Sequence, residues 1–324
     1  MPSRYVIGID IGGTKLLAGL ADEQLRVHRR VQRSMLGLDT ASLLDTMQQA
    51  TEELINSSQG EVSAVGFGIP SLIDQRSGTS VIAVHLPLAG VRLEALMSEH
   101  LQVPVFVDND GNCAMLAEHR AGAARGFEHA LLVALGTGIA GGMVLNGSLY
   151  RGAIGAGGEF GHMVIDIDGP PCHGNCPNHG CFEALCSGTA LAREAERVAV
   201  EFPQSELARA RAARRELDGA LVTELAHDGD AAAGDVIRLI GERLGVGLSN
   251  LVNIFNPEVV VVGGGVMAAG EMLLTPARAT VAARALPPSR DHVRIVPARF
   301  GSEAGMVGAA ALAWAELERR RLRP

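Results

Sequence analysis

The stretch IGIDIGGTKLLAGL (Ile7–Leu20) decides the fold, because it reads as a strand, a tight turn and a second strand. Apolar residues with high strand propensity fill Tyr5–Ile11, two glycines interrupt them, and a second apolar run follows at Leu16–Ala21. LLVALGTGIAGGMVLNG (Leu131–Gly147) has the same order of apolar run, glycine turn and apolar run. The similarity indicates an internal pseudo-repeat in an α/β chain.

The rest of the chain alternates between helical periodicity and short buried strands. Helices are expected where apolar residues recur every three or four positions, and strands where a short apolar run ends in turn residues. The expected helices are Thr40–Ser58, Ser187–Phe202, Leu207–Ala226, Ala231–Phe255 and Gly305–Arg320, and the further expected strands are Val62–Phe67, Val103–Val107 and Val259–Val262.

Length and composition exclude several classes of protein. The 324 residues suit two domains rather than one. The formal net charge of −8 argues against nucleic acid as a partner, and no apolar run is long enough to span a membrane. The N-terminus enters a strand at once, so we expect no signal peptide and a cytoplasmic location. Five cysteines in such a chain do not indicate a disulfide framework.

Both glycine turns have the chemistry of a phosphate-binding loop. DIGGTK (Asp10–Lys15) offers main-chain N–H groups, a hydroxyl and a positive charge, and LGTGIAGG (Leu135–Gly142) offers the N–H groups and a hydroxyl again. DIGGTK is not a Walker loop, because the glycine–lysine spacing differs and a strand follows the turn. A plain hairpin turn is the alternative for DIGGTK, but two such turns in one chain favour a nucleotide.

Three polar residues follow a buried strand in VFVDNDGN (Val105–Asn112). Ligands of open α/β sheets gather at the carboxyl ends of strands, so Asp108, Asn109 and Asp110 include a candidate general base. The alternative is a helix N-cap, a position that Asp and Asn commonly occupy. Both roles are compatible, with one residue capping the helix and another reacting.

A cysteine-rich loop, PCHGNCPNHGCFE (Pro171–Glu183), indicates a metal site. Closely spaced cysteines on a glycine- and proline-rich loop favour zinc over a disulfide, and the alternative is free thiols. Three thiolates need a fourth ligand for a closed tetrahedral site. The candidates are His162, in GEFGH, and His173 and His179 inside the loop. Such a closed site would be structural rather than catalytic.

Together these motifs resemble the ROK family of repressors, open reading frames and sugar kinases, within the actin-like ATPase superfamily. DIGGTK, Gly68–Pro70, DNDGN, LGTGIAGG, GEFGH, GCFE, NPEVVVVGGG and GMVGAAALA occur in the family's order over residues 5–315. The resemblance implies a two-domain actin-like ATPase (ribonuclease H-like) α/β fold with an active-site cleft between the domains. The expected domains are residues 1–112, completed by a C-terminal helix at 303–324, and residues 113–302 with the zinc loop.

The resemblance also implies roles for single residues. Asp110 corresponds to the catalytic base, and the expected sugar-binding residues are Asn109, Glu159, His162, Glu183 and Gly68. The expected ATP and phosphate contacts are Asp10, Gly12, Gly13, Thr14, Lys15, Thr137, Gly138, Gly264 and Gly265. His162, Cys172, Cys176 and Cys181 are the implied zinc ligands, and the loop would hold Glu183 and His162 in register.

Three positions depart from the family's pattern. The first gap of the cysteine motif is longer than usual, which bears on Cys172 as a ligand. Ala140 stands in place of a glycine in the second turn, and His85 stands where many relatives have asparagine. The last difference bears on which sugar is selected.

The function that this resemblance implies is an ATP- and Mg²⁺-dependent glucokinase that phosphorylates the 6-hydroxyl of glucose. Alternatives in the same class are an N-acetylmannosamine or N-acetylglucosamine kinase and a fructokinase, and polyphosphate is an alternative donor. A sugar-responsive repressor is a different class, disfavoured because only nine residues precede Asp10 and the charge is acidic. A sugar-binding pseudokinase is disfavoured by the intact Asp110 and both turns. A homodimer or homotetramer is expected.

Overall fold

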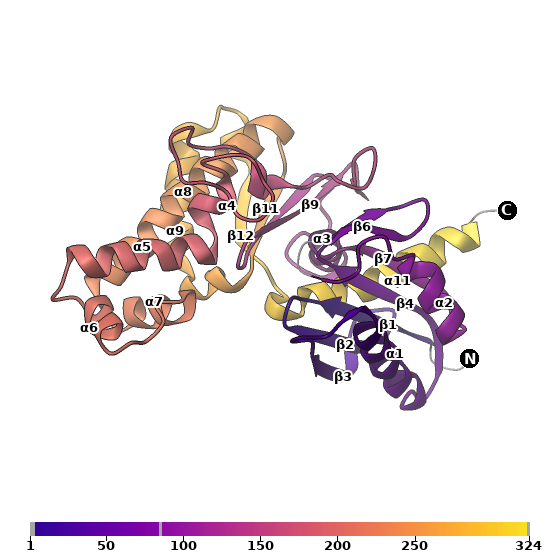
Figure 1. Cartoon of the computed structure of the whole chain (residues 1–324). Helices are drawn as coiled ribbons and strands as arrows, with labels where there is room; N and C mark the ends of the chain where they lie inside the picture. The colour runs from indigo at the N-terminus through magenta and orange to yellow at the C-terminus, as the bar shows by residue number, and fades with distance from the viewer. Residues whose placement is uncertain (1–3, 84–85, 323–324) are drawn as a thin grey trace. The chain divides into compact units, whose positions relative to one another are not determined.

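Two five-stranded sheets form the framework of the protein (Figure 1). The structure is a computed structural model that describes residues 4–83 and 86–322. The first sheet has the order β3-β2-β1-β4-β7 and the second the order β10-β9-β8-β11-β12. The strands are β1 (Arg4–Ile11), β2 (Lys15–Ala21), β3 (Val27–Ser34), β4 (Glu61–Ile69), β7 (Val105–Asn109), β8 (Ala130–Leu135), β9 (Ile139–Leu145), β10 (Ser148–Leu149), β11 (Val259–Gly263) and β12 (Arg294–Pro297), and β5 (Ser71–Asp74) pairs separately with β6 (Thr79–Ala83).

The two sheets repeat one topology, in agreement with the internal repeat expected from the glycine turns. In each sheet the first strand lies between its hairpin partner and a parallel strand that arrives later in the chain: β1 pairs with β2 and β4, and β8 lies between β9 and β11. The carboxyl ends of β1, β4 and β7 therefore meet at one edge of the first sheet, because these three strands are parallel. This edge carries Asp10 and the polar residues after Val107.

The chain divides into two units by its internal contacts. The first unit holds the described residues up to Gly126, Gly142–Gly158 and the residues from Ser302 onward, and the second holds Phe127–Gly141 and Glu159–Gly301. The boundary expected after residue 112 would cut α3 (Asp110–Ala121). The whole helix groups with the first unit because it packs against α11 (Ala304–Leu322).

Three glycines allow α11 to pack closely against the other elements of the first unit. A Cβ atom at Gly8 of β1 would lie 2.1 Å from the Met306 carbonyl oxygen, and one at Gly66 of β4 would lie 1.9 Å from that of Ala309. Likewise, a Cβ at Gly308 would lie 1.7 Å from the carbonyl oxygen of Cys113 in α3. The backbones approach so closely that only glycine fits at these three positions. Two further helices, α1 (Thr40–Asn56) and α2 (Leu93–Leu101), complete this unit.

The second unit is mainly helical outside its sheet. Its α-helices are α4 (Phe182–Cys186), α5 (Gly188–Glu201), α6 (Glu206–Ala212), α7 (Gly219–His227), α8 (Ala231–Phe255), α9 (Glu271–Arg284) and α10 (Ser289–His292). Short 3₁₀ turns occur at Phe160–His162, Gly265–Ala269 and Gly301–Glu303. α8 has the predicted bounds, and Asn256 ends it in the left-handed conformation at φ 46°.

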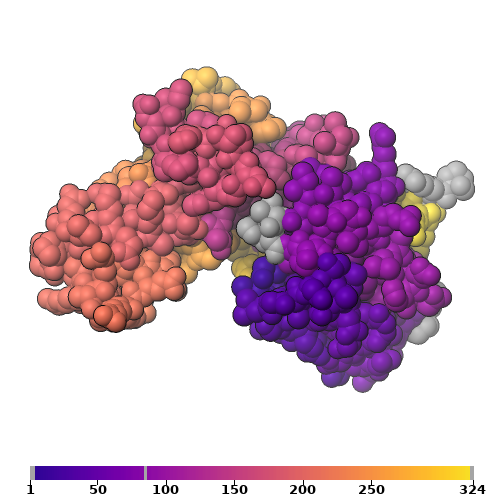
Figure 2. All heavy atoms as spheres, in the orientation of Figure 1, coloured from indigo at the N-terminus to yellow at the C-terminus, as the bar shows by residue number. Residues whose placement is uncertain are grey.

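One helix expected from the sequence, Leu207–Ala226, is wrong, because two helices occupy this stretch. α6 ends at Ala212, Arg214 takes a left-handed φ of 58°, and the Asp218 side chain caps α7 by accepting a hydrogen bond from Leu221 N. Both helices lie on the surface of the second unit (Figure 2). Arg209 and Arg211 of α6 form exposed ion pairs with Glu206 and Glu196.

No helix within residues 4–83 and 86–322 combines the length and apolar character that a membrane span requires.

Candidate active site

The first glycine turn leaves open space above its main chain. It closes the β1–β2 hairpin, with Gly12 N donating to the Lys15 carbonyl oxygen at 2.9 Å, and Gly13, Thr14 and Lys15 are exposed. Gly13 does not need its glycine for a positive φ or for internal packing, since no described atom would lie within 4 Å of a Cβ there. The missing side chain leaves room for an external group, as a phosphate requires.

Asp10, the next-to-last residue of β1, lies beside this turn and has a strongly shifted pKa. Burial, followed by the negative charge of Asp110, raises the pKa of Asp10 to about 7, while Lys15 acts in the opposite direction. The main chain of α11 also presses on it, because a Cβ at Gly305 would lie 2.4 Å from the carboxylate. Two carboxylates near each other and a lysine form a site that favours a cation or a proton.

The burial and the hydrogen bonds of Asp108 indicate a structural role. It is fully buried, and its Oδ2 accepts a hydrogen bond from Arg151 Nε at 2.7 Å. Its Oδ1 accepts from Asn112 Nδ2 at 2.9 Å and from Asn109 N at 2.8 Å. The sequence analysis did not single out Arg151. A lone arginine 43 positions away in a glycine-rich loop gives no local signal for this pairing.

Asn109 takes one of the two roles that the sequence left open, that of the helix cap. The Asn109 side chain caps α3, with its Oδ1 accepting hydrogen bonds from Gly111 N at 2.8 Å and Asn112 N at 3.3 Å. Asp110 is the first helical residue, and its Oδ1 accepts from Gly111 N at 2.9 Å. Burial raises the pKa of Asp110 above its ordinary value, which suits a proton acceptor working near neutral pH.

Two further positions of the first unit concern the sugar. Gly68 ends its strand against Cys113, whose Sγ would lie 3.2 Å from a Cβ at Gly68, so close packing alone gives a reason for glycine here. His85, the departure that bears on sugar selection, lies outside the described residues.

The second glycine turn is tied to Glu183. The turn closes the β8–β9 hairpin through a hydrogen bond of 2.9 Å from Gly136 N to the Gly138 carbonyl oxygen. Glu183 Oε2 accepts a hydrogen bond from Ile139 N at 2.7 Å, and a Cβ at Gly138 would lie 2.2 Å from the same oxygen. The expected sugar ligand Glu183 and the expected phosphate contact Gly138 are therefore neighbours.

The first two residues of α5 hold the main chain of this turn by hydrogen bonds. Gly188 N donates to the Gly136 carbonyl oxygen and Thr189 Oγ1 to that of Thr137, both at 2.8 Å. Ala140 lies next in β9.

Gly264 and Gly265 follow β11 in the second unit. Gly264 takes a φ of 83°, and a Cβ there would lie 2.3 Å from the Leu135 carbonyl oxygen at the end of β8. No described atom would lie within 4 Å of a Cβ at Gly265, so this glycine leaves open surface, as Gly13 does.

Four side chains of the cysteine loop and its neighbour converge as a metal site. The ligand atoms of His162, Cys172, Cys176 and Cys181 all lie within 4.8 Å of one another. Cys172 Sγ is 3.5 Å from His162 Nδ1, and Cys176 Sγ is 3.9 Å from Cys181 Sγ. A tetrahedral ion with Zn–S of about 2.3 Å and Zn–N of about 2.0–2.1 Å gives edges of about 3.6 Å (S to N) and 3.8 Å (S to S). The donor set therefore fits zinc.

The cluster settles two questions that the spacing left open. Cys172 belongs to it despite the longer first gap, whereas His173 and His179 are exposed and outside it. Burial, followed by the thiols of Cys181 and Cys176, raises the pKa of Cys172 to about 12. The Cys172 thiol therefore stays protonated near neutral pH unless a cation offsets the charge of its thiolate.

The loop's main chain brings the ligands together. Isolated antiparallel bridges join Val164 to Cys181 and Pro171 to His179. Gly180, at φ 64°, packs so closely on Asp166 that a Cβ would lie 1.4 Å from its carbonyl oxygen. Only glycine fits at this crossing.

Glu159 precedes a 3₁₀ turn, Phe160–His162, in the second unit, and His162 is the last residue of that turn. His162 N donates to the Glu159 carbonyl oxygen at 3.1 Å. The Glu159 side chain is exposed, while His162 directs Nδ1 to the cysteines.

Comparison with known proteins adds to this geometry. The ROK family sequence model matches residues 6–316. A glucokinase of Halalkalibacterium halodurans is 34% identical, over 95% of this chain and 94% of that protein. A ROK family glucokinase structure from Streptomyces griseus, in complex with glucose and AMPPNP, has a TM-score of 0.83 and 31% identity, and covers 96% of this chain and 99% of that one. The Bacillus subtilis xylose repressor is 27% identical, over 95% of this chain and 76% of the repressor. These likenesses confirm the two-domain actin-like ATPase fold.

Proposed function

The chain belongs to the ROK family, and we propose that it is an ATP-dependent glucokinase that phosphorylates the 6-hydroxyl of glucose. Its match to glucokinases extends over nearly its full length and theirs, at higher identity than the match to the Bacillus subtilis repressor. One observation carries the assignment of chemistry to residues: both carboxylate oxygens of the fully buried Asp108 accept hydrogen bonds from other side chains, whereas Asp110, a half-buried residue, accepts from Gly111 N and has a raised pKa.

Asp110 is the proposed general base. A sugar hydroxyl is a weak nucleophile, so a carboxylate accepts its proton as the oxygen bonds the γ-phosphorus and the bond to ADP breaks. The Asn109 cap and Gly111 N hold the first turn of α3, and with it Asp110. Asn109, Glu159, His162 and Glu183 are the proposed ligands of the other sugar hydroxyls.

The glycine turns are the proposed phosphate contacts. Gly12, Gly13, Thr14 and Lys15 in one unit, and Thr137 and Gly138 in the other, offer N–H groups, hydroxyls and a charge, and Gly264 and Gly265 would line the adenosine. Gly13 and Gly265 each leave open space beside the main chain of their own unit, which supports these roles. Mg²⁺–ATP supplies the γ-phosphoryl group and neutralises its charge. Asp10, whose pKa is raised by burial and by the negative charge of Asp110, lies next to the first of these turns in the chain and is the proposed partner of the bound cation.

Zinc is the proposed structural ion of the cysteine loop, bound by His162, Cys172, Cys176 and Cys181. Cys181 directly precedes α4, which carries Glu183, and His162 is itself a proposed sugar ligand. The ion would therefore hold Glu183 and His162 in place together. We place the protein in the cytoplasm, where thiols stay reduced and available to zinc. The proposed assembly is a homodimer or homotetramer. Light scattering measures the molar mass, which gives the number of chains.

A panel of sugars tests the proposed activity. Purified protein is assayed with glucose, fructose, N-acetylglucosamine and N-acetylmannosamine, with either ATP or polyphosphate as donor. We expect the highest kcat/KM for glucose with ATP, and a product whose ³¹P–¹H coupling places the phosphate on C6. A higher kcat/KM for another sugar, or for polyphosphate, contradicts the proposal, and Asp110→Asn protein controls for contaminating kinases.

A further inference from the structure

The five-residue helix α4 (Phe182–Cys186) is the element that presents Glu183. A helix this short is unstable alone, and each of its last carbonyl groups lacks a partner inside the helix. Because Glu183 is its second residue, any tilt of α4 moves the carboxylate away from Ile139 N, to which it is bonded at 2.7 Å. Something outside α4 must therefore fix its orientation.

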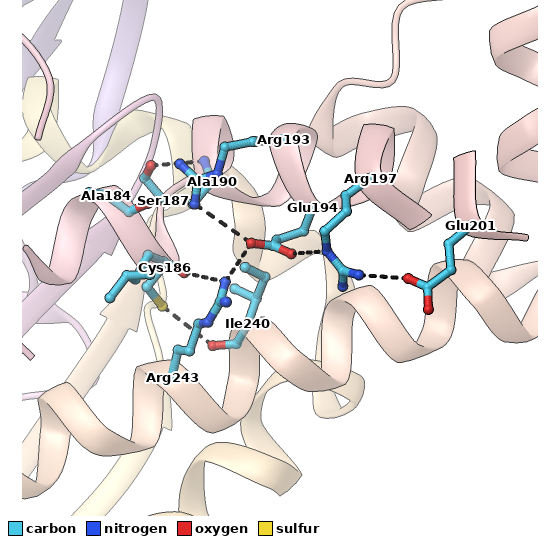
Figure 3. A network of polar contacts seen from close by, with 11 residues as sticks. Ala184, Cys186, Ser187, Ala190, Arg193, Glu194, Arg197, Glu201, Ile240 and Arg243 are labelled. Atoms are coloured by element: carbon cyan, nitrogen blue, oxygen red, sulfur yellow. Dashed lines mark hydrogen bonds and ion pairs between the residues drawn. The ribbon is translucent and has the colours of Figure 1, made fainter. Parts of the chain in front are cut away.

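Two arginines bind the carbonyl groups near the end of α4 (Figure 3). Arg193 of α5 donates from Nη2 to the Ala184 carbonyl oxygen at 2.8 Å. Arg243 of α8 donates from Nη1 to the Leu185 carbonyl oxygen at 3.4 Å. Cations at a helix C-terminus satisfy its carbonyl groups and interact favourably with the helix dipole. Two longer helices thus hold the C-terminal end of the short one.

One carboxylate organises both arginines. Glu194 of α5 is only 7% exposed, and its Oε1 accepts from Arg243 Nη1 at 2.9 Å and lies 3.7 Å from Arg193 Nη2. Its Oε2 accepts from Arg197 Nε at 3.0 Å. Burial alone would raise the pKa of Glu194, but the hydrogen bonds from Arg243 and Arg197 outweigh it and lower the pKa. Glu194 is therefore ionised near neutral pH and holds the guanidinium groups in place.

The main chain of α8 also packs directly against α4. A Cβ at Gly247 of α8 would lie 2.5 Å from the Phe182 ring, so the ring rests directly on the α8 backbone. Cys186 Sγ lies 3.4 Å from the Ile240 carbonyl oxygen (Figure 3). This packing fixes how closely α4 approaches α8. The hydrogen bonds from the arginines are directional, so they fix the orientation of the α4 axis.

We propose that Glu194, acting through Arg193 and Arg243, is a positioning residue for the sugar site: it orients α4 so that the Glu183 carboxylate stays on Ile139 N beside the second glycine turn. This inference rests on the proposed function only in taking Glu183 as a sugar ligand. The contacts that carry it belong to one unit and do not depend on a bound substrate.

Two variants test the proposal. Arg193→Gln removes one carbonyl contact at a partly exposed side chain, so the fold should survive. The double variant E194Q/R243Q removes the buried charges together, because loss of one partner alone leaves an unpaired buried charge that can prevent folding. Glu201→Gln is the control, since Glu201 pairs with the same network at its exposed end, 2.7 Å from Arg197 Nη1, and does not contact α4.

Hydrogen exchange and kinetics are measured on each variant. We expect amide exchange in α4 and at Ile139 to quicken about tenfold or more in both test variants, and the sugar KM to rise about tenfold with kcat changed less than about threefold. Glu201→Gln should match the wild type in both. Unchanged exchange overturns the proposal, and so does faster exchange with an unchanged KM.

The activity of the wild-type protein distinguishes a failure of the proposed function from a failure of the positioning role of Glu194. If it phosphorylates a different hexose, the proposed substrate is wrong, and the same variants are measured with that hexose. If it phosphorylates none of the four sugars, the proposed function fails, and exchange at α4 and Ile139 alone decides whether Glu194 positions Glu183.

Discussion

Asp108 Oδ2 lies 2.7 Å from Arg151 Nε, and this buried pair fastens a glycine-rich loop to the end of β7. Gly152, Gly155, Gly157 and Gly158 follow Arg151, and three of them take positive φ values, so the loop has little rigidity of its own. The pair, two residues before the proposed base, is a structural feature of the site.

Asp108→Asn should lower stability more than catalysis. The variant leaves the largely buried Arg151 without its countercharge, which costs about 3 kcal/mol or more. We expect calorimetry to show a Tm lower by roughly 5–10 °C, with kcat at 25 °C reduced much less than in an Asp110 variant. Asp45→Asn, at an exposed site of α1, is the control and should leave Tm unchanged. An unchanged Tm in the Asp108 variant would show that the pair contributes nothing.

Asp10→Asn should make the ligand-free protein more stable at high pH. The folded pKa of Asp10 is about 7, against about 3.9 in an unfolded chain. The folded state therefore holds this proton more tightly, so the stability from Asp10 is fully present below about pH 4 and is lost as the pH rises to 7. The Asn side chain cannot ionise and escapes this loss.

Urea unfolding without ATP or Mg²⁺ checks the effect. The variant should match the wild type near pH 4.5 and exceed it at pH 8 by on the order of 3 kcal/mol. A stability difference that does not change with pH would contradict the assigned pKa.

Cys172→Ser should abolish stoichiometric zinc. We expect about one zinc per chain in wild-type protein purified without chelators, because the four ligand atoms lie within 4.8 Å of one another and two of their distances, Cys172 to His162 and Cys176 to Cys181, are close to the edges of a zinc tetrahedron. Elemental analysis of the Ser variant should give a small fraction of that, along with a weaker sugar site. His179→Ala, in the same loop but outside the cluster, should keep its zinc. Full zinc in Cys172→Ser would remove Cys172 from the ligand set.

Gly13→Ala should weaken ATP binding without weakening the fold. A Cβ here meets no described atom within 4 Å, so Tm should stay within about 2 °C of wild type, while the methyl group fills the space proposed for a phosphate. We expect the KM for ATP to rise at least about tenfold. Gly234→Ala, equally open but within α8, is the control for glycine replacement. An unchanged KM for ATP would place the phosphates elsewhere.

Local patterns in the sequence predicted much of the fold and part of the site. Both hairpins and α8 could be predicted because each lies within a short stretch with a distinctive pattern. The cysteine loop indicated a metal site, but the choice of His162 over His173 and His179 came from the family resemblance. The division into α6 and α7 could not, because it depends on a left-handed Arg214 that nothing in the helical periodicity indicates.

The longer-range contacts of the site gave no local signal. Ile139 and Glu183 are 44 positions apart, and Arg243 and Glu194 are 49 apart. A single sequence shows these residues as ordinary polar or apolar positions on separate elements. Only the folded chain shows that Asp108 pairs with Arg151. It also shows which of the three neighbouring polar residues caps α3, namely Asn109.

The turnover of Asp110→Asn tests the central claim most directly. The substitution keeps the size of the side chain and removes the proton acceptor, so kcat with glucose and ATP should fall by roughly 10²–10⁴-fold. The dissociation constant for glucose, measured by calorimetry, should change little, and Asp108→Asn should keep most of its turnover. If Asp110→Asn kept near-normal kcat while Asp108→Asn, still folded, lost it, Asp110 would not be the base.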